Sequence, residues 1–335
     1  MKAESNTIEA MSINESQSRS NTFSQSFKPF IPSVAAIVIL VVLGQVLSNG
    51  FASVGNMGSV LSQASLLAMV AIGQSMVIFS GDFSIDLSAG AVMSMGALIG
   101  SMVSMGEDIM IIPAVLVLVG LGALIGFING ICVQKIRIPA LAMTLVMATV
   151  VNGFTFLYTR GQPAVMVPPL LMGVGRPIVG VIRPLLIIAV IAIVAMEFVM
   201  RRSRYGKSLY LVGNNRKAAA LCGIHVDRTV VIAFMLCSIF SCIAGLLLVG
   251  YTGSGQLKMG EEYTMLSIAA VVIGGARVAG GKGTLIGAFL GSVVMILLTS
   301  VLTAVGMAEG TRTFLQGVLL VLILMIQCRS PKLRQ

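Results

Sequence analysis

Long stretches without any charged residue constrain this chain more than any other feature. Positions 29–81 contain no Asp, Glu, Lys or Arg, and several later uncharged stretches are each long enough for one membrane crossing. A helix needs about 20 apolar residues to cross a hydrocarbon core that is about 30 Å thick. Only 10% of the 335 residues are charged, against about 25% in soluble domains. The chain is therefore predicted to be a polytopic membrane protein, which excludes a cytosolic enzyme, a disulfide scaffold and a nucleic-acid binder.

The uncharged stretches predict an all-α fold with about ten transmembrane helices. We place the segments at 31–48, 59–79, 87–106, 109–134, 138–159, 184–200, 229–257, 263–276, 283–308 and 313–328. As a helix, 263–276 would reach only about 21 Å, so it is either a short tilted span or a broken one.

The distribution of basic residues predicts the orientation of these segments. Ten crossings place both ends of the chain on one side. With both ends in the cytoplasm, 17 of the 22 Lys and Arg residues lie on the cytoplasmic side, as the positive-inside rule requires. Residues 1–30 then form a polar cytoplasmic tail, 31–328 the transmembrane domain with a long cytoplasmic loop at 201–228, and 329–335 a basic cytoplasmic tail.

Glycines spaced four residues apart recur in the fourth and ninth segments. They are Gly122, Gly126 and Gly130 in the fourth, and Gly283, Gly287 and Gly291 in the ninth. Small residues at this spacing let a neighbouring helix approach closely, so we interpret both sets as helix-packing stripes. Segments 2–5 and 7–10 start from opposite sides of the membrane, and the pattern indicates an inverted repeat, a common transporter plan. The general richness of membrane helices in glycine is the alternative explanation.

No motif predicts covalent chemistry or a metal site. Residues 201–208 and 276–284 imitate a nucleotide-binding loop, but Arg201 and Ala276 stand where the first glycine is required. The single histidine, His225, has no neighbouring ligand, and the five cysteines are scattered without a CxxC pair. We therefore expect no ATPase site, no metal and no catalytic residue in this chain.

Three carboxylates lie within or beside the apolar segments: Asp82, Asp86 and Glu197. Glu197 precedes Arg201 by four residues, which predicts an ion pair on one helix face. Asp86 precedes Ser88 at the expected start of the third segment, where a carboxylate stabilises free backbone amides. We favour this capping role over a proton relay.

The loop 201–228 contains a short predicted helix. Asn214 is placed to cap it, residues 216–222 favour helix, and Gly223 ends it. Such a helix suits docking into a groove of a soluble partner. An interfacial helix on lipid headgroups is the alternative.

Four stretches, in the same order along the chain, resemble one family. Residues 205–224 resemble the coupling loop of ribose-type ABC importer permeases, and 85–90 (IDLSAG) resemble their IDLSVG element. Residues 158–163 (YTRGQP) are similar to the external YTNGxP of these permeases, and 268–284 to their IAAVVIGG…AGGRGT signature. The resemblance implies ten helices and a dimeric permease core. The chain departs from the family pattern at 82–84, Asn152, Asn214 and 264–266, and all of these except Asn214 touch spans that are candidates to line the path, which leaves the exact sugar open.

The resemblance implies a function and a set of partners. The chain is expected to be the permease subunit of an ATP-driven monosaccharide importer in the bacterial inner membrane. It binds no cofactor itself, because ATP is used by partner ATP-binding subunits. A periplasmic or lipid-anchored binding protein delivers the sugar, and a second permease copy, identical or related, completes the path within the lipid. Import of a nucleoside or furanosyl signal molecule, or ion-coupled secondary transport, are the alternatives.

Two groups of site residues follow from this reading. The residues expected to couple to the ATPase, with Ala218, Ala219 and Leu221 as the packing face, are Gly213, Asn214, Asn215, Ala218, Ala219, Leu221, Gly223 and Ile224. Polar side chains that are candidates for the sugar path are Asp86, Ser88, Asn129 and Asn152.

Overall fold

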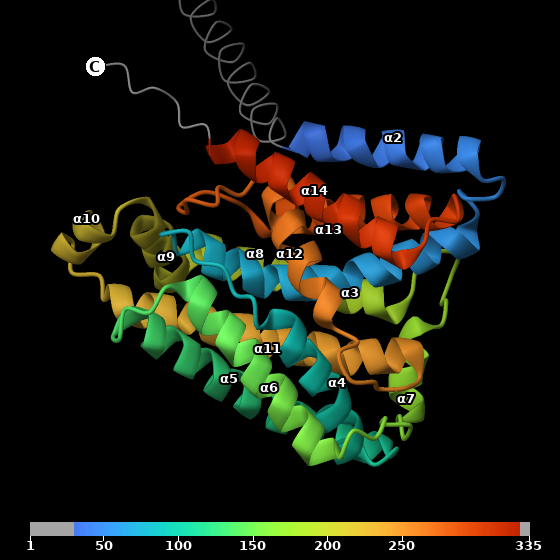
Figure 1. Ribbon diagram of the computed structural model, residues 1–335, viewed down its shortest axis with the longest axis horizontal. Coiled ribbons are helices and arrows are strands. Elements are labelled where there is room, and N and C mark those ends of the chain that lie inside the picture. The colour runs from blue at the N-terminus through green and yellow to red at the C-terminus, as the bar shows by residue number, and fades with distance from the viewer. Residues whose placement is uncertain (1–29, 329–335) are drawn as a thin grey trace, which may run out of the picture.

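The computed structural model describes residues 30–328, which form an all-helical bundle (Figure 1). The predicted tails 1–30 and 329–335 lie almost wholly outside these described residues. The longer helices are α2 (Ile31–Leu47), α3 (Val54–Phe79), α4 (Ala89–Ser104), α5 (Ile111–Gln134), α6 (Ala140–Thr159), α8 (Pro184–Arg202), α9 (Arg204–Asn214), α11 (Val226–Thr252), α12 (Glu261–Ile273), α13 (Leu285–Ala304) and α14 (Glu309–Cys328). The short ones are η2 (Asp108–Met110), α7 (Pro169–Met172), η3 (Gly173–Gly175) and α10 (Arg216–Leu221).

Six helices of the described chain are long and apolar enough to cross a membrane, judged by length and composition: α3, α5 together with η2, α6, α8, α11 and α13. The apolar helices α2 and α4 are shorter, and α12 has 13 residues. α12 begins at Glu261 rather than at 263, so two carboxylates occupy its first turn, where the helix dipole favours negative charge.

The centre of the bundle is formed by α3 and α11, which pack against each other. Every residue of α3 from Ala64 to Phe79 is buried. Outer helices such as α6 instead expose large apolar side chains, including Leu145, Phe154 and Leu157. Such a surface is unfavourable in water, and it suits contact with lipid or with another membrane chain.

The α5 glycines face α11. A Cβ atom on Gly122 would lie 2.8 Å from the Cα of Ile239, and one on Gly126 would overlap the backbone of Met235. At Gly130 the corresponding distance, to the Cα of Val231, is 2.7 Å. Because real Cβ atoms do not come this close to backbone, the two helices pack at a separation that only glycine permits.

The second stripe faces a different neighbour and is shorter than predicted. Gly287 and Gly291 lie against the backbone of α12 and of Gly274, which follows it. Gly283 is not part of the helix, because Thr284 caps α13 by accepting a hydrogen bond from the amide of Gly287 (3.1 Å). The prediction that Gly283 belongs to a helical stripe is therefore wrong.

The region 201–228 contains two helices where the sequence analysis predicted one. The hydroxyl of Ser203 caps α9 by accepting from the amide of Gly206 (3.1 Å), and α9 buries Leu209 and Val212 on one face. We did not foresee this helix.

The predicted short helix is present as α10, with a different cap and narrower bounds. Asn215, not Asn214, is its N-cap, and its side-chain oxygen accepts from the amide of Ala218 (3.0 Å). Asn214 is the last residue of α9, so its backbone is helical and it cannot be the N-cap of α10. Gly223 follows α10 with a φ of +78°, a conformation that glycine adopts at little cost.

Candidate functional site

The end of α9 is fixed to the bundle by direct contact of backbone with backbone. A Cβ atom on Gly213 would overlap the carbonyl oxygen of Phe79, at the end of α3, and would lie 2.5 Å from the nitrogen of Gly281. One on Gly81 would lie 2.8 Å from the carbonyl oxygen of Gly213. A side chain at position 213 or 81 would therefore not fit between α9, the end of α3 and the loop before α13.

Hydrogen bonds connect the same three parts. The amide of Gly281 donates to the carbonyl of Phe79 (3.1 Å), and the side-chain amide of Asn214 donates to the carbonyl of Gly281 (3.1 Å). The hydroxyl of Tyr210 donates to the carbonyl of Gly283 (3.0 Å), and its ring stacks on Phe79 with centroids 5.4 Å apart. α9, the end of α3 and the loop before α13 are therefore joined by both backbone and side-chain contacts.

Tyr210 keeps its proton across the physiological pH range. Burial, reinforced by the nearby carboxylate of Glu197, raises the pKa of Tyr210 to about 12. Its hydroxyl therefore remains a donor to Gly283 at any pH that a cell meets.

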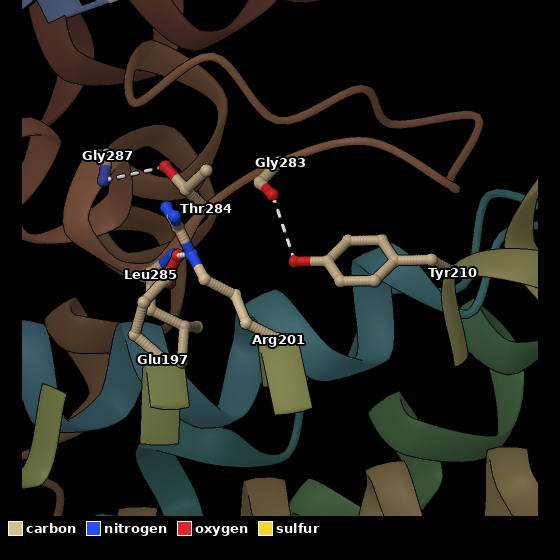
Figure 2. Close-up of polar contacts among 7 residues, drawn as sticks. All are labelled: Glu197, Arg201, Tyr210, Gly283, Thr284, Leu285 and Gly287. Carbon is tan, nitrogen blue, oxygen red and sulfur yellow. Dashed lines mark hydrogen bonds and ion pairs between the residues drawn. The ribbon is translucent and has the colours of Figure 1, made fainter. Parts of the chain in front are cut away.

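A buried carboxylate links α8 to the start of α13. Glu197 is 6% exposed; it accepts from Arg201 Nε at 2.6 Å through Oε1 and from the amide of Leu285 at 2.8 Å through Oε2. Figure 2 shows this arrangement beside the Tyr210–Gly283 bond. The predicted Glu197–Arg201 pair is confirmed. The bond to Leu285 was missed, because nothing in the local sequence brings the first amide of α13 to α8.

α10 projects from this anchored region and presents one apolar side chain outward. Leu221 is 89% exposed, and Ala218 is also exposed. Ala219 is only 4% exposed and packs in the core of its own chain. Successive helical residues point about 100° apart, so Ala218 and Ala219 cannot share one outward face. The predicted packing face is corrected to exclude Ala219.

The remaining coupling candidates lie beside α10. Gly223 is exposed and Ile224 is half-buried, packed against the core. They connect α10 to α11.

Three of the four path candidates form one closed cluster at the break between α3 and α4. The carboxylate of Asp86 accepts from the amide (2.8 Å) and the hydroxyl (2.5 Å) of Ser88 through Oδ1, and Asn129 Nδ2 donates to the Ser88 hydroxyl (3.1 Å). All three residues are fully buried, so they line no open path in this conformation. Asp86 Oδ1 accepts from the amide of Ser88, but Ser88 itself is the N-cap of α4, and the Asp86 carboxylate bonds no amide of the first turn. The prediction that Asp86 caps this helix is therefore wrong.

Asn152, the fourth candidate, lies apart from this cluster. It is half-exposed on α6, and its side-chain amide donates to Glu261 at the start of α12 (3.0 Å).

Two further polar side chains, Gln74 and Thr144, hold the backbone of the same break, and these bonds were not predicted. With its amide oriented to satisfy both atoms, Gln74 of α3 bonds the backbone N–H and C=O of Asp86 at 3.2 Å. The hydroxyl of Thr144 accepts from the amide of Leu87 (3.0 Å). Both bonds join residues distant in sequence, which periodicity does not reveal.

The fold and the site define a multi-pass membrane protein in which a short helix, α10, projects from one end of the bundle next to the anchored helix α9. The chain belongs to the family described as branched-chain amino acid transport system / permease component, whose model matches residues 56–324.

Relatives of known function are similar over nearly the whole chain. The ribose import permease protein RbsC of Escherichia coli strain K12 is 32% identical over 88% of this chain and 92% of its own length. RbsC of Bacillus subtilis strain 168 is 28% identical over 90% of this chain and 92% of its own length. The autoinducer 2 import system permease protein LsrC of Yersinia enterocolitica is 29% identical over 89% of this chain and 82% of its own length. No solved structure matches the chain.

Proposed function

We propose that this chain is the permease subunit of an ATP-driven importer, and that it forms the path by which a monosaccharide crosses the bacterial inner membrane. The similarity to ribose import permeases over almost the full length of both chains carries this proposal. The chain itself performs no covalent step and binds no cofactor, since ATP is hydrolysed by partner subunits.

Ten crossings with both ends in the cytoplasm are part of the proposal. The packing pairs support the inverted repeat: α3 with α13 matches α11 with α5, and α4 with α11 matches α12 with α3. The pairs α4 with α6 and α12 with α14 also match. Exchanging α3–α6 with α11–α14 thus preserves these contacts, as two related halves would require.

The partners are ATP-binding subunits, an external sugar-binding protein and a second permease copy. We propose that α10 docks into a groove of the ATP-binding subunit through Leu221 and Ala218, which are exposed on its outward side. Movement of α10 then passes through α9 to α3 and, by way of Tyr210 and Gly283, to the start of α13.

The buried cluster of Asp86, Ser88 and Asn129 belongs to the closed state of the path. These side chains join the α3–α4 break to α5, so they would have to separate if the path opened between these elements. Asn152 has its own partner on α12 and is kept as a separate candidate contact for the sugar.

Import of a furanosyl signal molecule is the second candidate function. The similarity to the autoinducer 2 permease LsrC, 29% identical over 89% of this chain, favours it. Uptake of labelled ribose and of labelled autoinducer 2, by cells that express the complete system, distinguishes the two.

The coupling step is tested by replacing Leu221 with Arg. The variant is expected to insert normally, because position 221 is 89% exposed, and to lose both copurification with the ATP-binding subunit and substrate uptake. Lys217→Arg, which keeps the charge at an exposed position of the same helix, is the matched control and should behave as wild type. Wild-type uptake by Leu221→Arg would contradict the docking role of α10.

A further inference from the structure

A groove of about 750 Å³ runs along the outer side of the α5–α11 contact, where α5 ends and α11 begins. Its wall on α5 consists of Phe127, Ile131 and Lys135, which are spaced by four residues and so share one helix face. Its wall on α11 includes Arg228, Ile232 and Met235, at similar spacing. Each wall is therefore apolar along the helix and ends in a basic residue.

The two ends of the groove differ in chemistry. Phe127 and Met235 lie about two turns inside α5 and α11, or roughly 10–12 Å along the helix axes from Lys135 and Arg228. Both helices are among those long and apolar enough to cross a membrane. The inner part of the groove therefore lies at hydrocarbon depth, which a soluble protein does not reach, and its mouth lies at the headgroup level.

The mouth carries charges that have no partner. Lys135, Asp227 and Arg228 are exposed and line the groove, and none of them forms an ion pair with any residue between 30 and 328. Two cations beside one carboxylate match a headgroup that contains both a phosphate and an ammonium group. A headgroup that carries a phosphate alone could bind the two cations but would leave Asp227 without a partner.

We propose that this groove is a binding site for one phosphatidylethanolamine molecule of the surrounding membrane. Lys135 and Arg228 hold its phosphate by charge-assisted hydrogen bonds, Asp227 holds its ammonium group, and one acyl chain lies along Phe127, Ile131, Ile232 and Met235. The inference does not depend on the transported substrate. The groove is also lined by Ala220 of α10 and by Ile224 and His225, so the lipid would lie beside the surface proposed to dock the ATP-binding subunit.

The test measures lipid binding to the purified, delipidated full-length permease by native mass spectrometry. Phosphatidylethanolamine is expected to bind more tightly than phosphatidylglycerol, which lacks the ammonium group, and than phosphatidylcholine, whose quaternary ammonium has no N–H donor. The double variant Lys135→Gln, Arg228→Gln is expected to bind it at least tenfold more weakly. Asp227→Asn should abolish the preference for phosphatidylethanolamine over phosphatidylglycerol.

Two controls separate a built site from general attraction of basic residues to lipid. Lys217→Gln removes an exposed positive charge that does not line the groove and should leave binding unchanged. Ile131→Trp fills the apolar wall and should weaken binding, whereas Ile112→Trp, exposed at the other end of α5, should not. Variants are compared only where their elution profile and melting temperature match wild type.

Three results would overturn the proposal. They are an unchanged affinity in the double variant, a preserved headgroup preference in Asp227→Asn, and a wild-type preference for phosphatidylglycerol. In each case Lys135 and Arg228 simply extend into the headgroup layer as long basic side chains do at helix ends.

Discussion

Glu197 shows how a single side chain can serve two elements at once. One oxygen of its carboxylate binds Arg201 on its own helix, and the other binds the first amide of α13. The guanidinium side is half-exposed to solvent, where ion pairs contribute little. The bond to the buried amide of Leu285 is therefore the stronger structural constraint.

Replacing Glu197 by Ala should destabilise the protein by about 1–3 kcal/mol, because the amide of Leu285 is left buried without an acceptor. Glu197→Gln keeps a side-chain oxygen at the same place and should restore most of the loss. Thermal unfolding of the purified variants measures the difference. Glu107→Gln, at an exposed position whose side chain makes no capping bond, is the control. If Glu197→Ala unfolds at the wild-type temperature, the bond to α13 contributes nothing.

At the scale of helices, the α5–α11 contact depends on glycines at 122, 126 and 130. On the same helix, Gly120 has open space where a Cβ atom would lie. Gly120 and Gly126 therefore lie on the same helix but face different surroundings, so a substitution at Gly120 can serve as the control for one at Gly126.

Gly126→Leu should force α5 and α11 apart, at a cost of about 1–3 kcal/mol from overpacking, and should lower both expression and transport. Gly120→Leu adds the same side chain on an open face and should be tolerated. The yield of folded protein in the membrane and the uptake rate measure both effects. Equal behaviour of the two variants would show that the close approach at Gly126 is not required.

Local patterns in the sequence predicted much at this scale, and contacts between distant elements account for what was missed. The four-residue spacing indicated the α5 stripe, and the i, i+4 spacing indicated the pair of Glu197 with Arg201. The buried face of α10 could not be predicted, because six residues do not reveal which side turns toward the bundle. The cluster of Asp86, Ser88 and Asn129, with Gln74 bonded to Asp86, forms only when α3, the α3–α4 break and α5 come together in the fold. No periodicity in the sequence predicts this contact.

At the scale of the whole molecule, α11 runs from one end of the bundle to the other. Lys207 lies on α9, which precedes α11 with α10 between them, and Lys258 lies in the loop that follows α11. A helix of 27 residues is about 40 Å long, which is enough to place its ends on opposite sides of a membrane.

Cysteines introduced at 207 and 258, in a chain without its native cysteines, should therefore be labelled from opposite sides. An impermeant maleimide added to intact spheroplasts should modify position 258 only, because the positive-inside rule predicts that 201–228 lies in the cytoplasm. Both positions are exposed lysines, so each serves as the control for the reactivity of the other. Labelling of position 207 from outside would contradict the orientation.

The glycine junction at the end of α9 has a consequence for how force moves through the protein. Side chains absorb small displacements by changing rotamer, so a contact made by long side chains has mechanical slack. The nearest neighbours of Gly213 are main-chain atoms of Phe79 and Gly281, and main-chain atoms have no rotamer to change. We therefore expect a displacement of α9 to reach α3 with less loss at this backbone contact than through the side-chain bonds of Tyr210 and Asn214 beside it.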